Sequence, residues 1–358
     1  MVITETRLRS QIIDPVGDPR WEALVSGRPD ATVFHTPQWL SVLRNSYGYE
    51  PRAAVLESED GSLAAGAPYC LVRSRLTGNR IVSLPFCDYA PPLTSSGEET
   101  GRLLEAMQSE AGSSGRVSYT QLRWGHLPEA PAALDAWSSD DSYSNYVVDL
   151  TGSLDDLERG LHSSARRAIR KAGREGLTAE VEGGIDAVRS FYRMNVLTRR
   201  KHGTFPQPWR FLEEIHRRLI SRENGFLVTA YYEGQPIAAD FVLCSNETAF
   251  YKYNASDPRF LGLRPNNLAL WHAICESKRR GMKAFDLGRV DAGNEGLRRF
   301  KLLWGAEEQP LPYFSYPASN GVAGGEQGTV YRLAAPVLRR APTGVLSVMG
   351  RALYRHFG

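Results

Sequence analysis

Cysteine is scarce in this sequence. The chain of 358 residues has four, at Cys70, Cys87, Cys244 and Cys275. They lie far apart and form no Cys-x-x-Cys or Cys/His pattern, so neither a zinc site nor a disulfide framework is indicated. We expect four reduced, mostly buried thiols, as in a cytosolic protein. Long apolar runs are also lacking, because no stretch approaches the roughly 18 apolar residues of a membrane span.

The motifs of several large enzyme classes are missing as well. Gly-x-Ser-x-Gly, the P-loop, His-Glu-x-x-His and the Rossmann glycine fingerprint do not occur. Serine hydrolases, P-loop nucleotidases, zinc proteases and dinucleotide-dependent dehydrogenases therefore receive no support. The first residues contain neither an apolar core nor a small-residue cleavage site, so we expect no signal peptide and a cytoplasmic protein.

Charge of one sign is not in large excess. The 43 Lys and Arg residues face 40 Asp and Glu residues, which leaves a net charge of +3. This balance does not by itself indicate a nucleic-acid-binding protein. Hydrophobic residues make up 42% of the chain, enough apolar material for two cores, and the length suggests two domains.

The two halves of the chain show the same order of predicted elements. In each half a helix opens at a proline near its first turn, where the missing N–H costs nothing; these openings are residues 34–39 and 205–209. Two strands joined by a tight turn follow, then a third strand, a helix and a fourth strand. In the first half these elements are 52–57, 63–72, 80–84, 98–111 and 117–123. In the second half they are 226–232, 236–244, 249–254, 267–280 and 284–287. Agreement of six elements in order indicates an internal duplication.

This pattern predicts an α/β (α+β) protein with two tandem domains of mixed sheet and a C-terminal helical tail. We expect an N-terminal domain at residues 1–140 and a C-terminal domain, with the site, at 141–316. Residues 317–358 would be a linker, rich in Gly and Ala up to 328, and a basic amphipathic tail. The boundary between the domains is predicted from the stretch 127–141, which is rich in Ala, Pro, Ser and Asp.

Four stretches of the second half resemble the signature stretches of Fem-type and BioF2-like acyltransferases. They are Ser164-x-x-Arg-x-x-Ile-Arg-Lys171, Pro265-Asn-Asn-Leu268, Phe285-Asp-Leu-Gly288 and Gly296-Leu-Arg-Arg-Phe-Lys301-x-x-Trp-Gly305. The last is the most specific, and the resemblance covers roughly residues 20–316. It implies a duplicated GNAT fold, whose element order is the one predicted above. Characterised members of this family transfer an amino acid from aminoacyl-tRNA to an amine of a peptidoglycan precursor, and others are assigned as acetyl-CoA-like acyltransferases.

Transfer of an acyl group to an amine requires a proton acceptor, stabilisation of an oxyanion and a grip on a phosphate-bearing substrate. Lys301 lies in the matching motif and is a candidate catalytic residue that binds phosphate or stabilises negative charge. The alternative is a solvated side chain on a helix. Asp240 interrupts an apolar run and is a second candidate, because a buried carboxylate is costly unless paired. It would orient the amine or act as base, or else form a structural salt bridge.

Lys252 is the third catalytic candidate and lies inside an aromatic strand. Because a strand alternates faces, we expect Lys252 to point away from both Tyr251 and Tyr253. It would then line a substrate cleft or extend its ammonium group to solvent.

Candidate substrate-binding residues are polar side chains of the motifs, strand ends and basic stretches. They are Arg299, Arg289, Asp286, Tyr253, Asn254, Asn266, Asn267, Arg167, Arg170 and Lys171. Asp286 and Arg289 lie at a strand end, where α/β folds tend to place ligands, or they pair with each other. The stretch 154–176 is predicted to be a strongly basic helix, and its part 161–176 attracts phosphates or is a solvated surface.

The segment Arg259-x-x-Gly262-x-Arg264 occupies the place of the GNAT pyrophosphate loop. The usual final small residue is replaced by Arg264, and Pro265 follows it. Small residues let the backbone approach a pyrophosphate closely, so this replacement weakens the case for coenzyme A and favours aminoacyl-tRNA modestly. We expect no metal and no tightly bound cofactor, with aminoacyl-tRNA or acyl-CoA as the donor.

The last 30 residues combine basic and apolar side chains and contain no acidic residue. The arginines are Arg332, Arg339, Arg340, Arg351 and Arg355, and apolar residues recur at helical spacing. Such a helix rests on an anionic membrane or docks on the protein itself. The first alternative would place the protein peripherally at the inner face of the membrane.

We therefore expect an N-acyltransferase of the GNAT superfamily whose acceptor is an amine of a cell-envelope precursor, small or lipid-linked, or of a polysaccharide component. tRNA would be a partner if it carries the acyl group. The alternative is a non-catalytic module that binds RNA or anionic envelope polymers. Clustering of Lys252, Asp240 and Lys301 in one concave site would favour the enzyme, and scatter over the surface would favour the module.

Overall fold

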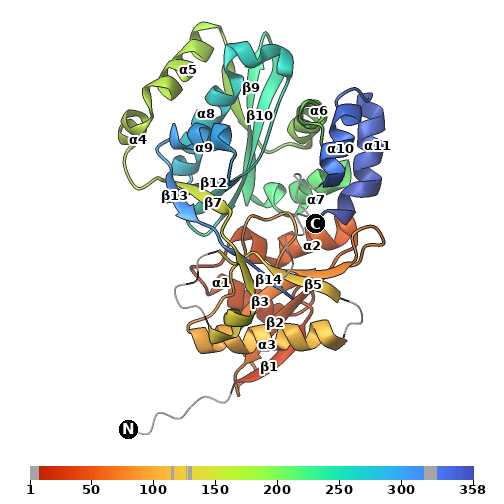
Figure 1. The fold of residues 1–358 in the computed structure, drawn as a ribbon. Coiled ribbons are helices and arrows are strands. Elements are labelled where there is room, and N and C mark those ends of the chain that lie inside the picture. Colours follow the sequence, from red (N-terminus) through yellow and green to blue (C-terminus); the bar gives the residue numbers. More distant parts are fainter. Residues whose placement is uncertain (1–7, 114–116, 126, 128–130, 318–328) are drawn as a thin grey trace. The chain divides into compact units, whose positions relative to one another are not determined.

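The chain folds into two compact units (Figure 1). The computed structural model describes residues 8–113, 117–125, 127, 131–317 and 329–358, without the side chains of 329–333. The first unit spans residues 1–143 and 310–322 and includes Gly358, and the second spans 144–309 and 323–357. The predicted linker falls mostly on 318–328, outside the described residues.

Each unit is built on a seven-stranded mixed sheet. The first sheet has the order β1 (Arg9–Ile13), β2 (Glu50–Glu57), β3 (Leu63–Val72), β4 (Asn79–Val82), β5 (Val117–Leu122), β14 (Tyr313–Tyr316) and β6 (Ser138–Asp140). Read from its opposite edge, the second has the order β8 (Thr178–Glu182), β9 (Gly225–Tyr232), β10 (Gln235–Ser245), β11 (Thr248–Ser256), β12 (Ala284–Asp291), β7 (Tyr143–Asp149) and β13 (Glu307–Pro310). In both sheets the first four strands pair antiparallel, and the fourth and fifth pair parallel.

The helices are distributed between the units. The first unit contains α1 (Pro19–Ser26), α2 (Pro37–Tyr47) and α3 (Gly97–Ser113). The second contains α4 (Leu154–Gly160), α5 (Ser163–Arg174), α6 (Ile185–His202), α7 (Trp209–Arg218), η4 (Pro258–Leu263), α8 (Pro265–Arg279), α9 (Glu295–Leu302), α10 (Thr329–Leu338) and α11 (Thr343–Leu353). Helices α3 and α8 stand at the same place in the two units, between the two strands that pair parallel.

The predicted duplication is confirmed, since all six repeated elements are present in order in both halves. The fold is therefore the predicted pair of GNAT-like α/β domains with mixed sheets and a helical C-terminal region. The sequence pattern missed the short elements β1, α1 and β8, and also the 18-residue helix α6. The predicted basic helix divides into α4 and α5, because the His162 side chain accepts a hydrogen bond from the Ser164 N–H and starts a new helix.

The final strand of the fold joins an unexpected sheet. β14 pairs antiparallel with β5 and with β6, so residues 313–316 belong to the sheet of the first unit. The predicted domain boundaries, 1–140, 141–316 and 317–358, therefore remain a proposal for how the two repeats divide the chain. The sheets show that the chain returns to the first unit after completing the second.

Successive side chains of each strand point to opposite faces of the first sheet. Side chains of β2 and β3 pack against Leu103, Leu104 and Met107 of α3. Gly66 faces the other way, where an added Cβ would lie 2.5 Å from the ring of Trp21 on α1. Helices therefore cover both faces of this sheet, as an α/β layer architecture requires.

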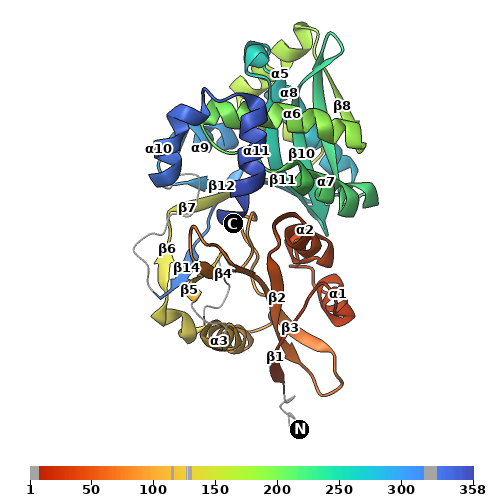
Figure 2. The same ribbon diagram turned by 90° about the vertical axis from the view of Figure 1, so that its right-hand side faces the viewer.

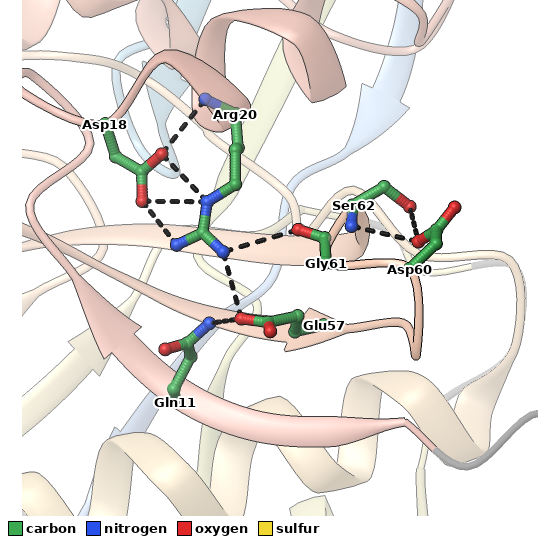
Figure 3. A network of polar contacts seen from close by, with 7 residues as sticks. All are labelled: Gln11, Asp18, Arg20, Glu57, Asp60, Gly61 and Ser62. Carbon is green, nitrogen blue, oxygen red and sulfur yellow. Dashed lines mark hydrogen bonds and ion pairs between the residues drawn. The ribbon is translucent and has the colours of Figure 1, made fainter.

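A polar network holds the outer strands of the first unit (Figure 3). The Arg20 guanidinium on α1 lies 2.6 Å from Asp18 and 3.0 Å from Glu57 on β2, and it donates to the Gly61 carbonyl at 3.3 Å. Gln11 of β1 donates to the same Glu57 carboxylate. This network joins α1, β1 and the β2–β3 turn, and it contains none of the candidate site residues.

Candidate functional site

A pocket of about 600 Å³ opens in the second unit at the start of α8. Its lining comes from α5, η4, α8 and α9: Ser164, Arg167, Ala168, Lys171, Leu261, Arg264, Pro265, Asn266, Asn267, Phe300 and Leu303. Four predicted substrate-binding residues, Arg167, Lys171, Asn266 and Asn267, meet there. Three cationic side chains and no acidic side chain are among the lining residues, so the pocket suits an anion.

The start of α8 adds to this positive field. Pro265 occupies the first turn, and Arg264 precedes it with φ +66°, a left-handed conformation that side chains other than glycine rarely adopt. A helix N-terminus carries partial positive charge that favours phosphate or carboxylate. At α8 this field acts without a row of open N–H groups, because Pro265 has none and those of Asn267 and Leu268 donate to the Arg264 carbonyl. Arg264 therefore keeps a strained backbone at the place where the GNAT loop usually has a small residue, and it adds a cation beside the helix start.

The matching helix start in the first unit has the opposite chemistry. The first turn of α3 contains Glu98 and Glu99, and the Glu99 carboxylate accepts the Ser95 N–H at 2.6 Å. Arg28 donates to the carbonyl of Thr94 at 2.6 Å. Side chains of the protein thus occupy this helix start, whereas the first turn of α8 contains no acidic residue. Of the two equivalent positions, the one in the second unit is suited to an anion.

Lys301 lies on α9 and is buried, with 5% of its surface exposed. Its Nζ donates to the carbonyls of Gly288 at 2.6 Å and Arg289 at 3.0 Å, and it lies 5.5 Å from the ring centroid of Tyr146. The alternative of a solvated lysine is therefore wrong for Lys301, although Arg299 on the same helix is exposed. Through these bonds Lys301 fixes α9 to the end of β12.

Asp286 and Arg289 belong to the same region. The Asp286 carboxylate accepts the Gly288 N–H at 2.6 Å and the amide of Asn145 on β7 at 2.9 Å, and Arg289 lies 3.4 Å from Asp291. Asp286 thereby fixes the part of β12 whose carbonyls bind Lys301. Sequence reasoning missed Asn145, a polar residue next to the buried Tyr146 in β7.

Asp240 is fully buried in the middle of β10. Its Oδ1 accepts the hydroxyl of Tyr251 at 3.0 Å and the amide of Asn254 at 2.6 Å, whereas Oδ2 has no hydrogen-bond partner. Burial raises the pKa of this carboxyl to about 7, and the two donors oppose the rise. Because its partners are neutral, the structural salt bridge that the sequence left open is wrong.

Lys252 departs from the expected strand geometry. Phe241 pairs with Tyr253 and Val242 with Tyr251, so Lys252 is the extra residue of a β-bulge on β11. Its ammonium group lies 5.4 Å from the ring centroid of Tyr253. The expectation that Lys252 points away from both tyrosines is therefore wrong for Tyr253, because the bulge interrupts the alternation.

The candidate residues thus fall into three groups in the second unit. Arg167, Lys171, Asn266 and Asn267 line the pocket; Asp286 and Arg289 lie on β12, with Lys301 of α9 bonded to its end; and Asp240, Lys252, Tyr253 and Asn254 lie on β10 and β11. Asp240, Lys252 and Lys301 are not lining residues of the pocket. Arg170 is exposed and lies 3.9 Å from Glu158.

Sequence reasoning did not include Arg264 or Phe300 among the site residues. Arg264 directly precedes the motif that begins at Pro265, Phe300 lies within the motif 296–305, and both side chains line the pocket. Phe300 precedes Lys301 on α9, so the helix that Lys301 anchors also supplies an apolar wall. Their position in or next to these motifs was the feature of the sequence that could have identified both as site residues.

Neither a metal cluster nor a membrane span is found in the part of the chain that the structure describes. No group of three or more His, Cys, Asp or Glu side chains there could hold a metal ion. No helix there is long and apolar enough to cross a bilayer. All four cysteines are thiols, and Cys70, Cys87 and Cys244 are buried.

Comparison with known proteins agrees with this architecture. Residues 159–313 match the model of a family described as an acetyltransferase (GNAT) domain. No curated protein matches the sequence. The match therefore covers the part of the chain that forms the pocket.

Solved structures with the same fold share little sequence with this chain. The crystal structure of FemX is 13% identical, covers 86% of this chain and 97% of its own, and has a TM-score of 0.69. L-PGS from Bacillus licheniformis is 16% identical and covers 90% and 98%, with a TM-score of 0.55. A tandem GNAT protein from the clavulanic acid biosynthesis pathway is 11% identical and covers 88% and 100%, with a TM-score of 0.51. The chain therefore has the tandem GNAT fold of Fem-type proteins over most of its length.

Proposed function

We propose that this protein is an N-acyltransferase that holds the phosphate-bearing part of an activated acyl donor at the start of α8. The observation that carries the proposal is the cationic pocket at that helix start, with Arg167, Lys171 and Arg264 in its lining. The match of the surrounding residues to an acetyltransferase domain supports acyl transfer. The acidic first turn of α3 supports a single donor site in the second unit.

The pocket suits either of two donors. Acyl-CoA is the general donor of GNAT domains and carries a pyrophosphate, which a helix start can bind. An added Cβ at Gly262 would meet no atom within 4 Å, so the loop leaves open space there. Arg264 and Pro265 replace the usual small residues, however, and an exposed arginine suits the phosphates of an aminoacyl-tRNA. We propose aminoacyl-tRNA as the more favoured donor.

The acceptor we propose is an amine of a cell-envelope precursor, small or lipid-linked, or of a polysaccharide component. FemX and a putative lysylphosphatidylglycerol synthetase, whose C-terminal domain is 15% identical with a TM-score of 0.55, have this fold. The name of the second protein describes an aminoacylated lipid, which is consistent with an envelope acceptor.

The reaction would proceed by direct attack of the amine on the acyl carbon. A nitrogen–carbon bond forms, the ester C–O or thioester C–S bond breaks, and the nitrogen loses a proton. Asp240 has a pKa of about 7, but it is fully buried and does not line the pocket, so the nitrogen would lose its proton to solvent rather than directly to Asp240. Lys301 would act as a positioning residue, because its ammonium group holds two carbonyls at the end of β12.

A donor assay tests this proposal. The protein is incubated with radiolabelled acetyl-CoA, or with tRNA charged with a labelled amino acid, together with an extract of envelope precursors. We expect label in an amide product with one of the two donors. Binding of tRNA or anionic envelope polymer without labelled product from either donor would contradict acyl transfer and support the non-catalytic binding module.

A further inference from the structure

The C-terminal helices α10 and α11 have one face that packs on the second unit. Leu338 and Leu346 are 1% and 0% exposed. Gly203, at the end of α6, and Ala335 on α10 approach so closely that a Cβ on Gly203 would lie 2.8 Å from that of Ala335. The rings of Phe205 and Phe357 stack with centroids 6.1 Å apart. The helices therefore dock on the protein, as one of the two sequence alternatives expected, and Figures 1 and 2 show α11 beside α6.

The opposite face of the same helices presents valines to solvent. Val337 on α10 is 70% exposed, and Val345 and Val348 on α11 are 48% and 57% exposed. Val345 and Val348 lie three residues apart, so they share one face of α11, while Leu346 and Gly350 lie on the buried face. Docking thus leaves an apolar strip that the described part of the chain does not cover.

Cations surround this strip. Arg339 and Arg340 follow Val337 by two and three residues, Arg351 follows Val348 by one turn of α11, and all three are exposed. The sequence from 329 to 358 contains no acidic side chain. Apolar side chains flanked by arginines on one helical face suit the boundary between anionic headgroups and acyl chains, and each arginine there contributes through its charge.

We infer that the exposed face of α10 and α11 is a docking surface for an anionic phospholipid bilayer. Val337, Val345 and Val348 enter the headgroup boundary, and Arg339, Arg340 and Arg351 contact lipid phosphates. RNA offers phosphates without an apolar layer, so it leaves the three valines unexplained. A bilayer offers partners to both kinds of side chain. The helices stay packed on the second unit while their exposed face binds the membrane surface, so no spanning segment is required.

Co-sedimentation with vesicles tests the inference on the full chain. We expect the protein to bind vesicles of phosphatidylglycerol and phosphatidylcholine at low salt and to be released at about 1 M salt, where the screening length is about 3 Å. Arg340→Gln/Arg351→Gln should weaken the partition at low salt by about tenfold or more. Val345→Asp/Val348→Asp should weaken it similarly, because charge then enters the apolar boundary.

The first unit offers a matched control. Arg75 is exposed and Leu76 is 64% exposed, so Arg75→Gln/Leu76→Asp removes the same kinds of side chain elsewhere. The control variant should bind like the unaltered protein, and all variants should keep the same circular dichroism spectrum and melting temperature. Equal binding by every variant, or no binding to anionic vesicles at low salt, would overturn the inference. Self-association in solution that Val345→Asp/Val348→Asp abolishes would overturn it in favour of a second copy.

Discussion

At the scale of single residues, Asp240 shows how burial determines the chemistry available near neutral pH. The carboxyl has two neutral donors and an Oδ2 without a partner. Because the pKa is near 7 in the folded chain and about 4 in an unfolded chain, the folded state binds an extra proton between these values. The free energy of unfolding must therefore fall as pH rises from about 4 to about 7.

Asp240→Asn should remove this pH dependence. The amide keeps an oxygen that accepts from Tyr251 and Asn254, and it bears no charge to desolvate. Between pH 5 and pH 8, the free energy of unfolding of the parent should fall relative to that of the variant by on the order of 2–4 kcal/mol. Urea unfolding at both pH values measures this, and parallel pH profiles of the two proteins would contradict the raised pKa.

Lys301 should affect stability as well as activity. Lys301→Ala leaves the carbonyls of Gly288 and Arg289 without their charged donor, which should lower the free energy of unfolding by about 1–3 kcal/mol and reduce transfer. The exposed Arg299 on the same helix is a matched control, and Arg299→Ala should leave stability unchanged. Unchanged stability of Lys301→Ala in urea would show that these bonds are dispensable.

At the scale of elements, the sequence predicted those with strong patterns. Proline at the first turn and a central strand pair with a tight turn identified α2, α7 and the β9–β10 hairpin. The bulge at Lys252 could not be predicted, because it depends on how β10 and β11 pair. The partners of Lys301 could not be predicted either, since backbone carbonyls have no sequence signature. The pocket was predicted in part, through motif residues that the helix start at Arg264 brings together.

The docking of α11 depends on a glycine. A side chain at Gly350 would collide with the carbonyl oxygen of Pro206, so Gly350→Val should detach α11 from the second unit. We expect faster proteolysis within 329–358 and a lower melting temperature. Gly344→Val is the control, because a Cβ at Gly344 would meet nothing within 4 Å. Equal proteolysis of the two variants would contradict the docking.

At the scale of the whole molecule, the two units differ in how their sheets are completed. The second sheet uses strands between residues 143 and 310, whereas the first sheet needs β14, which lies between β5 and β6. Duplication was predictable because each half repeats the order of elements. The return of β14 to the sheet of the first unit was not predictable, since a four-residue strand has too short a pattern to assign it to a sheet.

This connection predicts unequal behaviour of two fragments. Residues 1–143 alone lack β14, so the edges of β5 and β6 are left unpaired and should promote aggregation. Residues 8–358 contain every strand and also the docked helices α10 and α11, and they should remain monomeric. Size-exclusion chromatography compares the two, and a monomeric, cooperatively unfolding 1–143 fragment would contradict the role of β14.

The central claim is that acyl transfer uses the pocket at the start of α8. It is tested most directly by the kcat/KM for the donor identified in the transfer assay, measured for the parent, for Arg167→Gln/Arg264→Gly and for Arg174→Gln. Arg174 lies on α5 with Arg167 but is not a lining residue. Loss of charge-assisted contacts worth about 1.5–3 kcal/mol each predicts at least a tenfold fall for the pocket variant. The control should match the parent. Equal kcat/KM for all three proteins would contradict the account.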